Sequence, residues 1–268
     1  MRLKDKTAIV TGGASGIGKA ICELFAEEGA QVSIADINIT GGQDTLRSIR
    51  SNGGEATFIK TDVSVESDVE AMVDSTVRAF GTVNVLVNDA AAFVFGRVEE
   101  VTQDDWSRVM GVNVIGPSLT SKHVLPIMKA AGGGSIVNIA SVAGKMGNPD
   151  RPNYNASKAA AISYTKSSAL KLSKFNINVN CICPGNIWTP MWDKISMRQF
   201  NFGSEIFSEF SDIKNNRELF QRVTELSTPL KRDQSADDIG YAAAFLLSDA
   251  AKNITGQSIN VDGGRVMG

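Results

Sequence analysis

The sequence is poor in cysteine, histidine and long apolar runs. Its three cysteines, Cys22, Cys181 and Cys183, are too few and too unevenly spaced for a disulfide framework or a CxxC metal site. Cys181 and Cys183 alternate in a strand-like run, which predicts two small buried side chains on one face. We therefore expect free thiols and no metal site.

The single histidine, His123, also limits the chemistry. It lies in the helical run TSKHVLPIMKAAG, away from any Ser or Cys nucleophile motif, and is predicted to be a packing or interface residue. A histidine-based triad is excluded unless His123 itself is the base.

There is no excess of basic residues: 27 Lys and Arg face 29 Asp and Glu, for a net charge of −2. This balance argues against a surface for nucleic acid or an anionic membrane. Nowhere do 18 uncharged apolar residues run together, and no apolar signal segment follows the N-terminus. We expect a cytoplasmic protein whose partners are small molecules or copies of itself.

What the chain does have is a regular alternation of apolar β-branched runs with helical patterns. The predicted strands are 7–11, 31–36, 56–63, 83–89, 134–141, 177–185 and 257–264. The predicted helices are 18–28, 42–51, 66–80, 102–131, 153–173 and 236–248. Near-continuous apolar strands suit a sheet covered on both faces. The alternation predicts an α/β fold with a doubly wound parallel sheet of about seven strands, in a single domain over residues 1–268.

One region departs from the alternation. Seven of the 18 aromatic residues fall between Trp188 and Phe220, directly after the strand that ends at Pro184 and Gly185. Ligands of open α/β sheets bind outside the carboxyl ends of strands, so a substrate lid at about 188–228 is expected. A helical pair on the surface or in a subunit interface is the alternative.

The stretch TGGASGIG, residues 11–18, lies between the first strand and the first helix. Gly12, Gly16 and Gly18, with Ser15 and Ile17 between them, allow a tight turn and close approach of a pyrophosphate to the helix N-terminus. The spacing is G-x-x-x-G-x-G. Glycines also serve ordinary strand-to-helix turns, so this pattern alone is weak evidence for a dinucleotide.

Asp36 strengthens the assignment because it closes the second strand about 20 residues downstream, where a carboxylate can accept hydrogen bonds from a ribose. The same charge repels a 2′-phosphate. Neither the glycine loop nor Ile37 supplies a cation to neutralise such a phosphate. The cofactor is therefore predicted to be NAD rather than NADP, with a solvated turn carboxylate as the alternative.

Residues 154–158 read YNASK at the start of a predicted helix, so Tyr154 and Lys158 lie one turn apart on the same face. Removing a hydride from an alcohol carbon requires a group that takes the hydroxyl proton. Free tyrosine has a pKa of about 10, and a neighbouring cation favours its phenolate. The pair is either a proton-transfer device or a surface contact.

Taken together, these motifs resemble the short-chain dehydrogenase/reductase family. The resemblance rests on TGGASGIG, Asp36, Asp62-Val63, Asn88, Asn113, Ser141, the Tyr154–Lys158 pair and Pro184-Gly185, in the family's order from Lys6 to about Gly264. It implies a Rossmann-type, NAD(P)-dependent alcohol dehydrogenase, with Tyr154 as general base or acid.

The resemblance also implies roles for single residues. Ser141 would hydrogen-bond the substrate oxygen, and Lys158 would hold the nicotinamide ribose as well as act on Tyr154. Asn113 would anchor a water beside that lysine. The remaining cofactor contacts would be Asp62 and Val63 at the adenine, Asn88 and Ala90 near the adenosine ribose, and Ile187 and Thr189 at the carboxamide and pyrophosphate, next to Pro184 and Gly185.

The sequence departs from the family at Asp89 and Ala91, where Asn and Gly are frequent. Ala91 places a methyl group where the backbone and the cofactor usually approach closely, and Asp89 adds a possible charge, so both residues affect the expected cofactor affinity. For the substrate we expect a secondary alcohol, polyol-like or diol-like first, and a hydroxysteroid or 3-hydroxyacyl compound as alternatives. A non-catalytic NAD(H)-binding regulator is the alternative from another class. By resemblance, a homotetramer assembled through 102–131, 153–173 and a contact near the C-terminus is expected.

Overall fold

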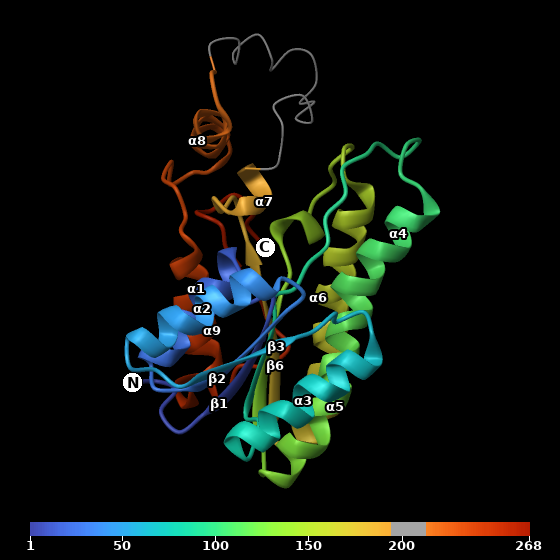
Figure 1. The fold of residues 1–268 in the computed structure, drawn as a ribbon. Helices are drawn as coiled ribbons and strands as arrows, with labels where there is room; N and C mark the ends of the chain where they lie inside the picture. The colour runs from blue at the N-terminus through green and yellow to red at the C-terminus, as the bar shows by residue number, and fades with distance from the viewer. Residues whose placement is uncertain (194–212) are drawn as a thin grey trace.

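One parallel sheet lies between two layers of helices (Figure 1). The computed structural model describes residues 1–193 and 213–268. The sheet has seven strands in the order β3-β2-β1-β4-β5-β6-β7, and every pair is parallel. The strand order reverses between β1 and β4, so a crevice opens at the carboxyl ends of these strands.

The strands are short and apolar, as parallel strands covered on both faces must be. They are β1 (Thr7–Thr11), β2 (Gln31–Asp36), β3 (Ala56–Lys60), β4 (Val85–Asn88), β5 (Gly134–Ile139), β6 (Ile177–Pro184) and β7 (Ser258–Val261).

The α-helices are α1 (Gly16–Glu27), α2 (Ile39–Ser51), α3 (Glu66–Phe80), α4 (Gln103–Met110), α5 (Gly116–Ala130), α6 (Pro152–Leu172), α7 (Pro190–Asp193), α8 (Asn216–Ser227) and α9 (Ala236–Leu247). A π-turn, η1 (Gly111–Ile115), joins α4 to α5. The 3-10 turns are η2 (Val142–Gly144), η3 (Ser173–Phe175) and η6 (Asp249–Ala251).

The two helix layers bury opposite faces of each strand. Side chains alternate along a strand, so Val10 packs with α1 and α9 while Ile9 packs with α3 and α5. Figure 1 shows α1, α2 and α9 on one side of the sheet and α3 to α6 on the other. Cys181 and Cys183 are both free and fully buried in one small apolar cluster, as predicted.

The predicted fold class is confirmed, but several boundaries differ. Residues 102–131 are not one regular helix, because η1 widens the chain at Gly111–Ile115. Strand β3 ends at Lys60, so Asp62 and Val63 lie in the loop that follows it. Helix α8 lies in the segment predicted as a lid, for which a helical pair was the alternative.

Part of the predicted lid lies outside the described residues, including Phe200, Phe202, Phe207 and Phe210. The described part contains α7 and α8. Within the described ranges, no helix is long and apolar enough to cross a membrane.

Candidate active site

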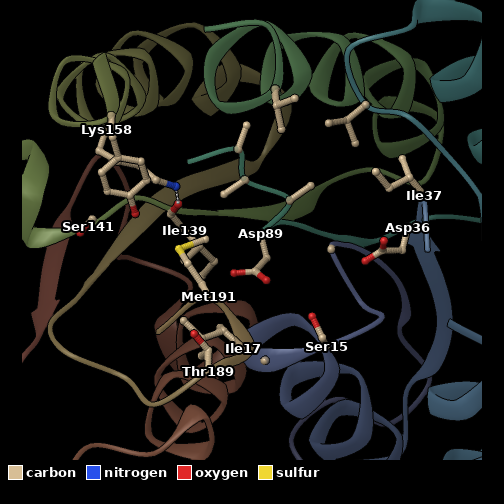
Figure 2. Close-up of a pocket in the computed structure, with 18 of the residues that line it drawn as sticks. Ser15, Ile17, Asp36, Ile37, Asp89, Ile139, Ser141, Lys158, Thr189 and Met191 are labelled. Carbon is tan, nitrogen blue, oxygen red and sulfur yellow. Dashed lines mark hydrogen bonds between the residues drawn. The ribbon is translucent and has the colours of Figure 1, made fainter. Parts of the chain in front are cut away.

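A cavity of about 600 Å³ lies at the carboxyl edge of the sheet (Figure 2). Its wall comes from the loops that follow β1 to β6 and from the first turns of α1 and α6. A volume of this size suits a ligand as large as a drug or a cofactor. Figure 2 shows Asp36 at one end, Ser141 and Lys158 at the other, and Asp89 between them.

The glycine loop closes the cavity floor because backbone approaches backbone there. Gly12 has φ +74°, and a Cβ on it would lie 2.8 Å from the Ala90 nitrogen. A Cβ on Gly18 would lie 2.3 Å from the Gly12 carbonyl oxygen. Only glycine fits either position. The result is an open N-terminus of α1 facing the cavity, which favours an anion such as a pyrophosphate.

Asp36 is held in place by main-chain donors. The Ala14 N–H donates to Oδ2 at 3.0 Å and the Asn38 N–H donates to Oδ1 at 2.8 Å. Asp36 and Ile37 both line the cavity. Further along the same wall, Asp62 accepts from the Ser64 N–H and hydroxyl at 2.9 and 2.6 Å. These loops are fixed by their own hydrogen bonds, so this end of the cavity is preorganised.

Asp89 is an unusual carboxyl in the middle of the cavity. Burial raises its pKa to about 7, and the Asp36 charge also raises it, while the Lys158 ammonium and the Gly18 N–H lower it. Figure 2 shows the carboxylate directed into the cavity. It accepts the Gly18 N–H, so it occupies one of the donors at the N-terminus of α1. Asp89 therefore competes with any anion bound at that terminus.

Tyr154 and Lys158 lie on one turn of α6, facing the cavity. The Lys158 Nζ is 5.6 Å from the centroid of the Tyr154 ring and donates to the Ile139 carbonyl at 2.8 Å. Lys158 is only 3% exposed. A buried ammonium with one protein acceptor has donors left for a ligand.

Ser141 follows β5 as the N-cap residue of η2 and also lines the cavity. Its hydroxyl accepts the Ala143 N–H at 3.1 Å, which turns the chain into η2 and fixes the side chain. Phe93 packs against Tyr154 with ring centroids 4.8 Å apart. The Tyr154 ring therefore has an aromatic ring and a cation as neighbours.

Asn113 lies behind the cavity wall. It is 2% exposed in η1, and its amide is engaged with two neighbours. Oδ1 accepts the Ala92 N–H at 2.7 Å, and Nδ2 donates to the Ala92 carbonyl at 3.0 Å and to Ser157 Oγ at 2.9 Å. Its side chain therefore ties the loop after β4 to α6, and both amide hydrogens are already used.

Asn88 is also one layer back: its amide donates to Asn138 at 2.8 Å and accepts from Thr120 at 2.7 Å. Gly18 lies under the loop. The structure brings the other predicted residues into the cavity wall, namely Gly12, Ser15, Gly16, Ile17, Asp36, Ile37, Asp62, Val63, Ala90, Ser141, Tyr154, Lys158, Pro184, Gly185, Ile187 and Thr189.

Sequence reasoning missed Ser107 and Arg108 of α4, which line the cavity. Met191 and Trp192 of α7 also line it and fall within the predicted lid segment. The aromatic content after Gly185 was the only signal for α7, and no motif marked α4. The histidine His123 is not among the wall residues and contacts Glu66 at 3.0 Å instead. Within the described ranges no group of three or more potential metal ligands occurs.

Comparison with known proteins identifies the family. The family profile described as short chain dehydrogenase matches residues 6–199, and the profile described as enoyl-(acyl carrier protein) reductase matches residues 207–265. The chain belongs to the short-chain dehydrogenase family. This short-chain dehydrogenase is accordingly an oxidoreductase of a family that binds NAD(P) and acts on alcohol and carbonyl groups.

Two curated relatives match this short-chain dehydrogenase over its whole length. Galactitol 2-dehydrogenase of Agrobacterium fabrum is 37% identical over 268 residues, and sorbitol dehydrogenase of Cereibacter sphaeroides is 35% identical over 268 residues. Both alignments cover 100% of each chain. The crystal structure of levodione reductase superposes with a TM-score of 0.89 at 32% identity, covering 98% of both chains.

Proposed function

We propose that the protein interconverts a secondary alcohol and its ketone with NAD⁺/NADH, and that the alcohol is a polyol or diol. The proposal depends on one observation: a single cavity has a group of polar catalytic candidates at one end and a nucleotide-binding loop at the other. Lys158 and Ser141 lie at one end (Figure 2), with Tyr154 beside Lys158, and the glycine loop with Asp36 forms the other. Such a cavity suits a dinucleotide whose reactive ring lies beside the tyrosine.

The described residues fit this cofactor. Gly12, Ser15, Gly16 and Ile17 would hold the pyrophosphate at the N-terminus of α1, because no Cβ intrudes at the two closest glycines. Asp62 and Val63 would contact the adenine, and Ala90 would contact the adenosine ribose. Asn88 would fix the loop that carries Ala90 from the layer behind it. The contacts at the carboxamide end would come from Pro184, Gly185, Ile187 and Thr189. When bound, the nicotinamide would accept or supply the hydride.

NAD rather than NADP is proposed because of Asp36. Its carboxylate lines the cavity with both oxygens fixed by main-chain N–H groups. A fixed anion can accept hydrogen bonds from ribose hydroxyls and would repel a 2′-phosphate.

Tyr154 would take the hydroxyl proton in the oxidation and return it in the reduction. The Lys158 Nζ lies 5.6 Å from the centroid of the Tyr154 ring and has free donors for the nicotinamide ribose. Ser141 would donate to the substrate oxygen as charge develops there. Because the Asn113 amide is already used, this residue would serve the proton path through its main-chain position in η1 and not through its side chain.

The polyol assignment is supported by relatives named for galactitol and sorbitol, which align over their full lengths. We also propose that the chain is one domain and that 188–228 covers the substrate end. Met191 and Trp192 in the cavity wall support this role. Phe220 of α8 packs against Trp192 with ring centroids 5.1 Å apart, which ties α8 to that wall.

Steady-state kinetics test the proposal. The purified enzyme is assayed with NAD⁺ and NADP⁺ over alditols, butanediols, hydroxysteroids and 3-hydroxyacyl thioesters. We expect turnover of alditols or diols with NAD⁺ and little with NADP⁺. Turnover of hydroxysteroids or 3-hydroxyacyl substrates alone would replace the polyol assignment, and a preference for NADP⁺ would overturn the role of Asp36.

A cytoplasmic homotetramer is also proposed. Ile115 and Leu170 are 52% and 83% exposed on the two long helical segments, and Tyr241 is 51% exposed on α9. Such apolar side chains suit subunit contacts. Free, buried cysteines suit a reducing compartment. Light scattering on the purified protein tests the assembly, and a monomeric mass would contradict it.

A further inference from the structure

Ser157 belongs to the YNASK stretch, but the proposed chemistry does not use it. It directly precedes Lys158 on α6 and is fully buried, and it is not among the wall residues of the cavity. Serine is a weaker helix former than alanine, and a buried hydroxyl needs hydrogen-bond partners. The two partners of this hydroxyl therefore indicate what Ser157 does.

The Ser157 hydroxyl joins the side chain of Asn113 to the main chain of Tyr154. Its Oγ accepts from Asn113 Nδ2 at 2.9 Å and donates to the Tyr154 carbonyl at 2.7 Å. In a regular α-helix the carbonyl of residue 154 also accepts the N–H of residue 158. The hydroxyl therefore binds the helical turn that carries both Tyr154 and Lys158.

Asn113 extends this connection to the loop after β4. Its Oδ1 accepts the Ala92 N–H at 2.7 Å, and its Nδ2 donates to the Ala92 carbonyl at 3.0 Å. Ala92 lines the cavity. Ala92, Asn113 and Ser157 are all buried, so water does not compete for these hydrogen bonds. The cavity wall and the helix of Tyr154 are thus joined through one buried amide and one buried hydroxyl.

The same loop also contacts the ring of Tyr154. Phe93, the residue after Ala92, packs against this ring with centroids 4.8 Å apart. On its other side the loop is fixed to β1, because Thr11 Oγ1 accepts the Ala90 N–H at 3.2 Å. One loop therefore holds Tyr154 at two points, the ring and the main chain, and its own position is set by the sheet.

We propose that Ser157 is a positioning residue, which fixes the phenol of Tyr154 relative to the wall that the loop after β4 forms. This inference rests on the proposed role of Tyr154 in proton transfer. A general base must lie within hydrogen-bond reach of its proton, and a displacement of about 1 Å can cost about 100-fold in rate. Without the Ser157 hydroxyl, one Asn113 N–H loses its acceptor and the turn is released from the loop.

Ser157→Ala removes the connection with a small change in volume. We expect kcat to fall about tenfold, the equivalent of one hydrogen bond. The substrate KM and the Kd for NADH should change by less than about twofold, because Ser157 is outside the cavity wall. Ser157→Thr keeps the hydroxyl and should restore most of kcat. A lower melting temperature with kcat unchanged would mean that Ser157 is only structural, and would overturn the proposal.

Ser121→Ala is the matched control. Ser121 is buried on α5, and its hydroxyl donates to the Pro117 carbonyl at 2.6 Å. The change removes a similar buried bond from a helix with no residue in the described cavity wall. It should lower the melting temperature and leave kcat unchanged. If kcat falls equally in both alanine variants, the positioning role is wrong. Should Ser157→Ala not fold, Ser157→Cys replaces it, since a thiol is a weak donor.

The Tyr154 side chain can also be observed without turnover. The chain has three tyrosines, Tyr154, Tyr164 and Tyr241, so tyrosine labelled with ¹³C at Cζ gives three NMR signals. Tyr154→Phe identifies the signal of residue 154. We expect Ser157→Ala to shift or broaden that signal in the free protein and with NADH, and to leave the other two in place. An unchanged Tyr154 signal would overturn the proposal.

This measurement separates the inference from the proposed function. If Ser157→Ala alters the Tyr154 signal but the wild type oxidises no alcohol, Ser157 does position the ring and only the proposed function fails. If alcohols are oxidised and Tyr154→Phe is inactive, while Ser157→Ala keeps the wild-type kcat and signal, this inference alone fails.

Discussion

The two ends of the cavity are built differently. The glycine loop and Asp36 come from residues close in sequence. Main-chain N–H groups donate to both carboxylate oxygens of Asp36, and the main chain of Ala90 packs closely against Gly12. The opposite end gathers Ser141, Tyr154 and the α7 wall from distant parts of the chain. The cofactor end is therefore a local property of β1, α1 and β2, whereas the substrate end depends on tertiary packing.

This difference implies that the two ends can be altered separately. Changes at Tyr154, or at Phe220 where it packs against Trp188 and Trp192, should affect turnover and substrate affinity without weakening cofactor binding. Changes at Asp36 should alter cofactor binding and leave substrate affinity unchanged. Asp89 lies between the ends and should couple cofactor binding to protons.

The largest effect is expected for Tyr154→Phe. Removing the phenolic hydroxyl should lower kcat by about 1,000-fold, within the usual range for general acid–base catalysis. NADH affinity, measured by fluorescence titration, should not change because the ring and Lys158 remain. Tyr164→Phe, at a residue of α6 outside the cavity wall, is the matched control. Unchanged activity in Tyr154→Phe would refute the proton-transfer role and favour a non-catalytic tyrosine.

Phe220→Ala should loosen the substrate end. Phe220 is fully buried between Trp188 and Trp192, with ring centroids 5.3 and 5.1 Å away. Truncating such a ring costs about 3 kcal/mol of packing. We expect a higher substrate KM and a lower melting temperature, with cofactor affinity unchanged.

Phe80→Ala, at the partly exposed end of α3, is the control and should leave KM unaltered. A loss of NADH binding in Phe220→Ala equal to the change in KM would show that the two ends are not separable.

Asp36→Asn tests the cofactor end. Removing the charge should raise the preference for NADP⁺ over NAD⁺ by about 100-fold, because like-charge contacts at an interface cost several kcal/mol. The ratio of dissociation constants for NADPH and NADH measures the change. The side chain keeps its size and one acceptor oxygen, so the loop should stay folded. Continued rejection of NADPH by this variant would mean that Asp36 is not the discriminating group.

The smallest effect is expected for Asp89→Asn, and it depends on pH. The Asp89 pKa is about 7 in the folded protein against an ordinary value of 3.8. Between these values the native state holds a proton that the unfolded chain releases, so stability falls as pH rises from about 4 to about 7. Solvent in the cavity reduces this contribution to about 1–2 kcal/mol.

The Asp89→Asn variant should lack this dependence of unfolding on pH. Its NADH affinity should be about tenfold higher than that of the wild type at pH 8 and similar at pH 6, because an ionised Asp89 competes with the pyrophosphate. Asp74→Asn, exposed on α3, is the control. Equal affinities for both enzymes at pH 8 would show that Asp89 stays protonated or lies outside the anion's reach.

The sequence allowed the sheet and most of the cavity wall to be predicted because their signals are local. Apolar runs mark β1 and β2 to the residue, and the glycine spacing marks the loop between β1 and α1. The prediction was less accurate where neighbours decide the geometry. Strand β3 ends at Lys60, before the predicted 63, because Asp62 turns the chain by accepting from Ser64.

The π-turn at Gly111–Ile115 had no signal in the periodicity of 102–131. It exists where Asn113 reaches across to Ala92 and Ser157, contacts that the packed loop after β4 and α6 provide. For the same reason Asn88 and Asn113 were predicted beside the ligands but lie one layer behind the wall. Spacing along the chain says which residues belong to a site, but not which layer of it they occupy.

The sequence by itself determined the α/β alternation, the glycine loop, the carboxylate after β2 and the Tyr-Lys turn, since each is set by residues within one loop or one helical turn. Only the tertiary structure decided that Asp89 is a buried carboxyl of raised pKa. That property depends on desolvation and on charges from distant segments, and both arise only when the chain packs.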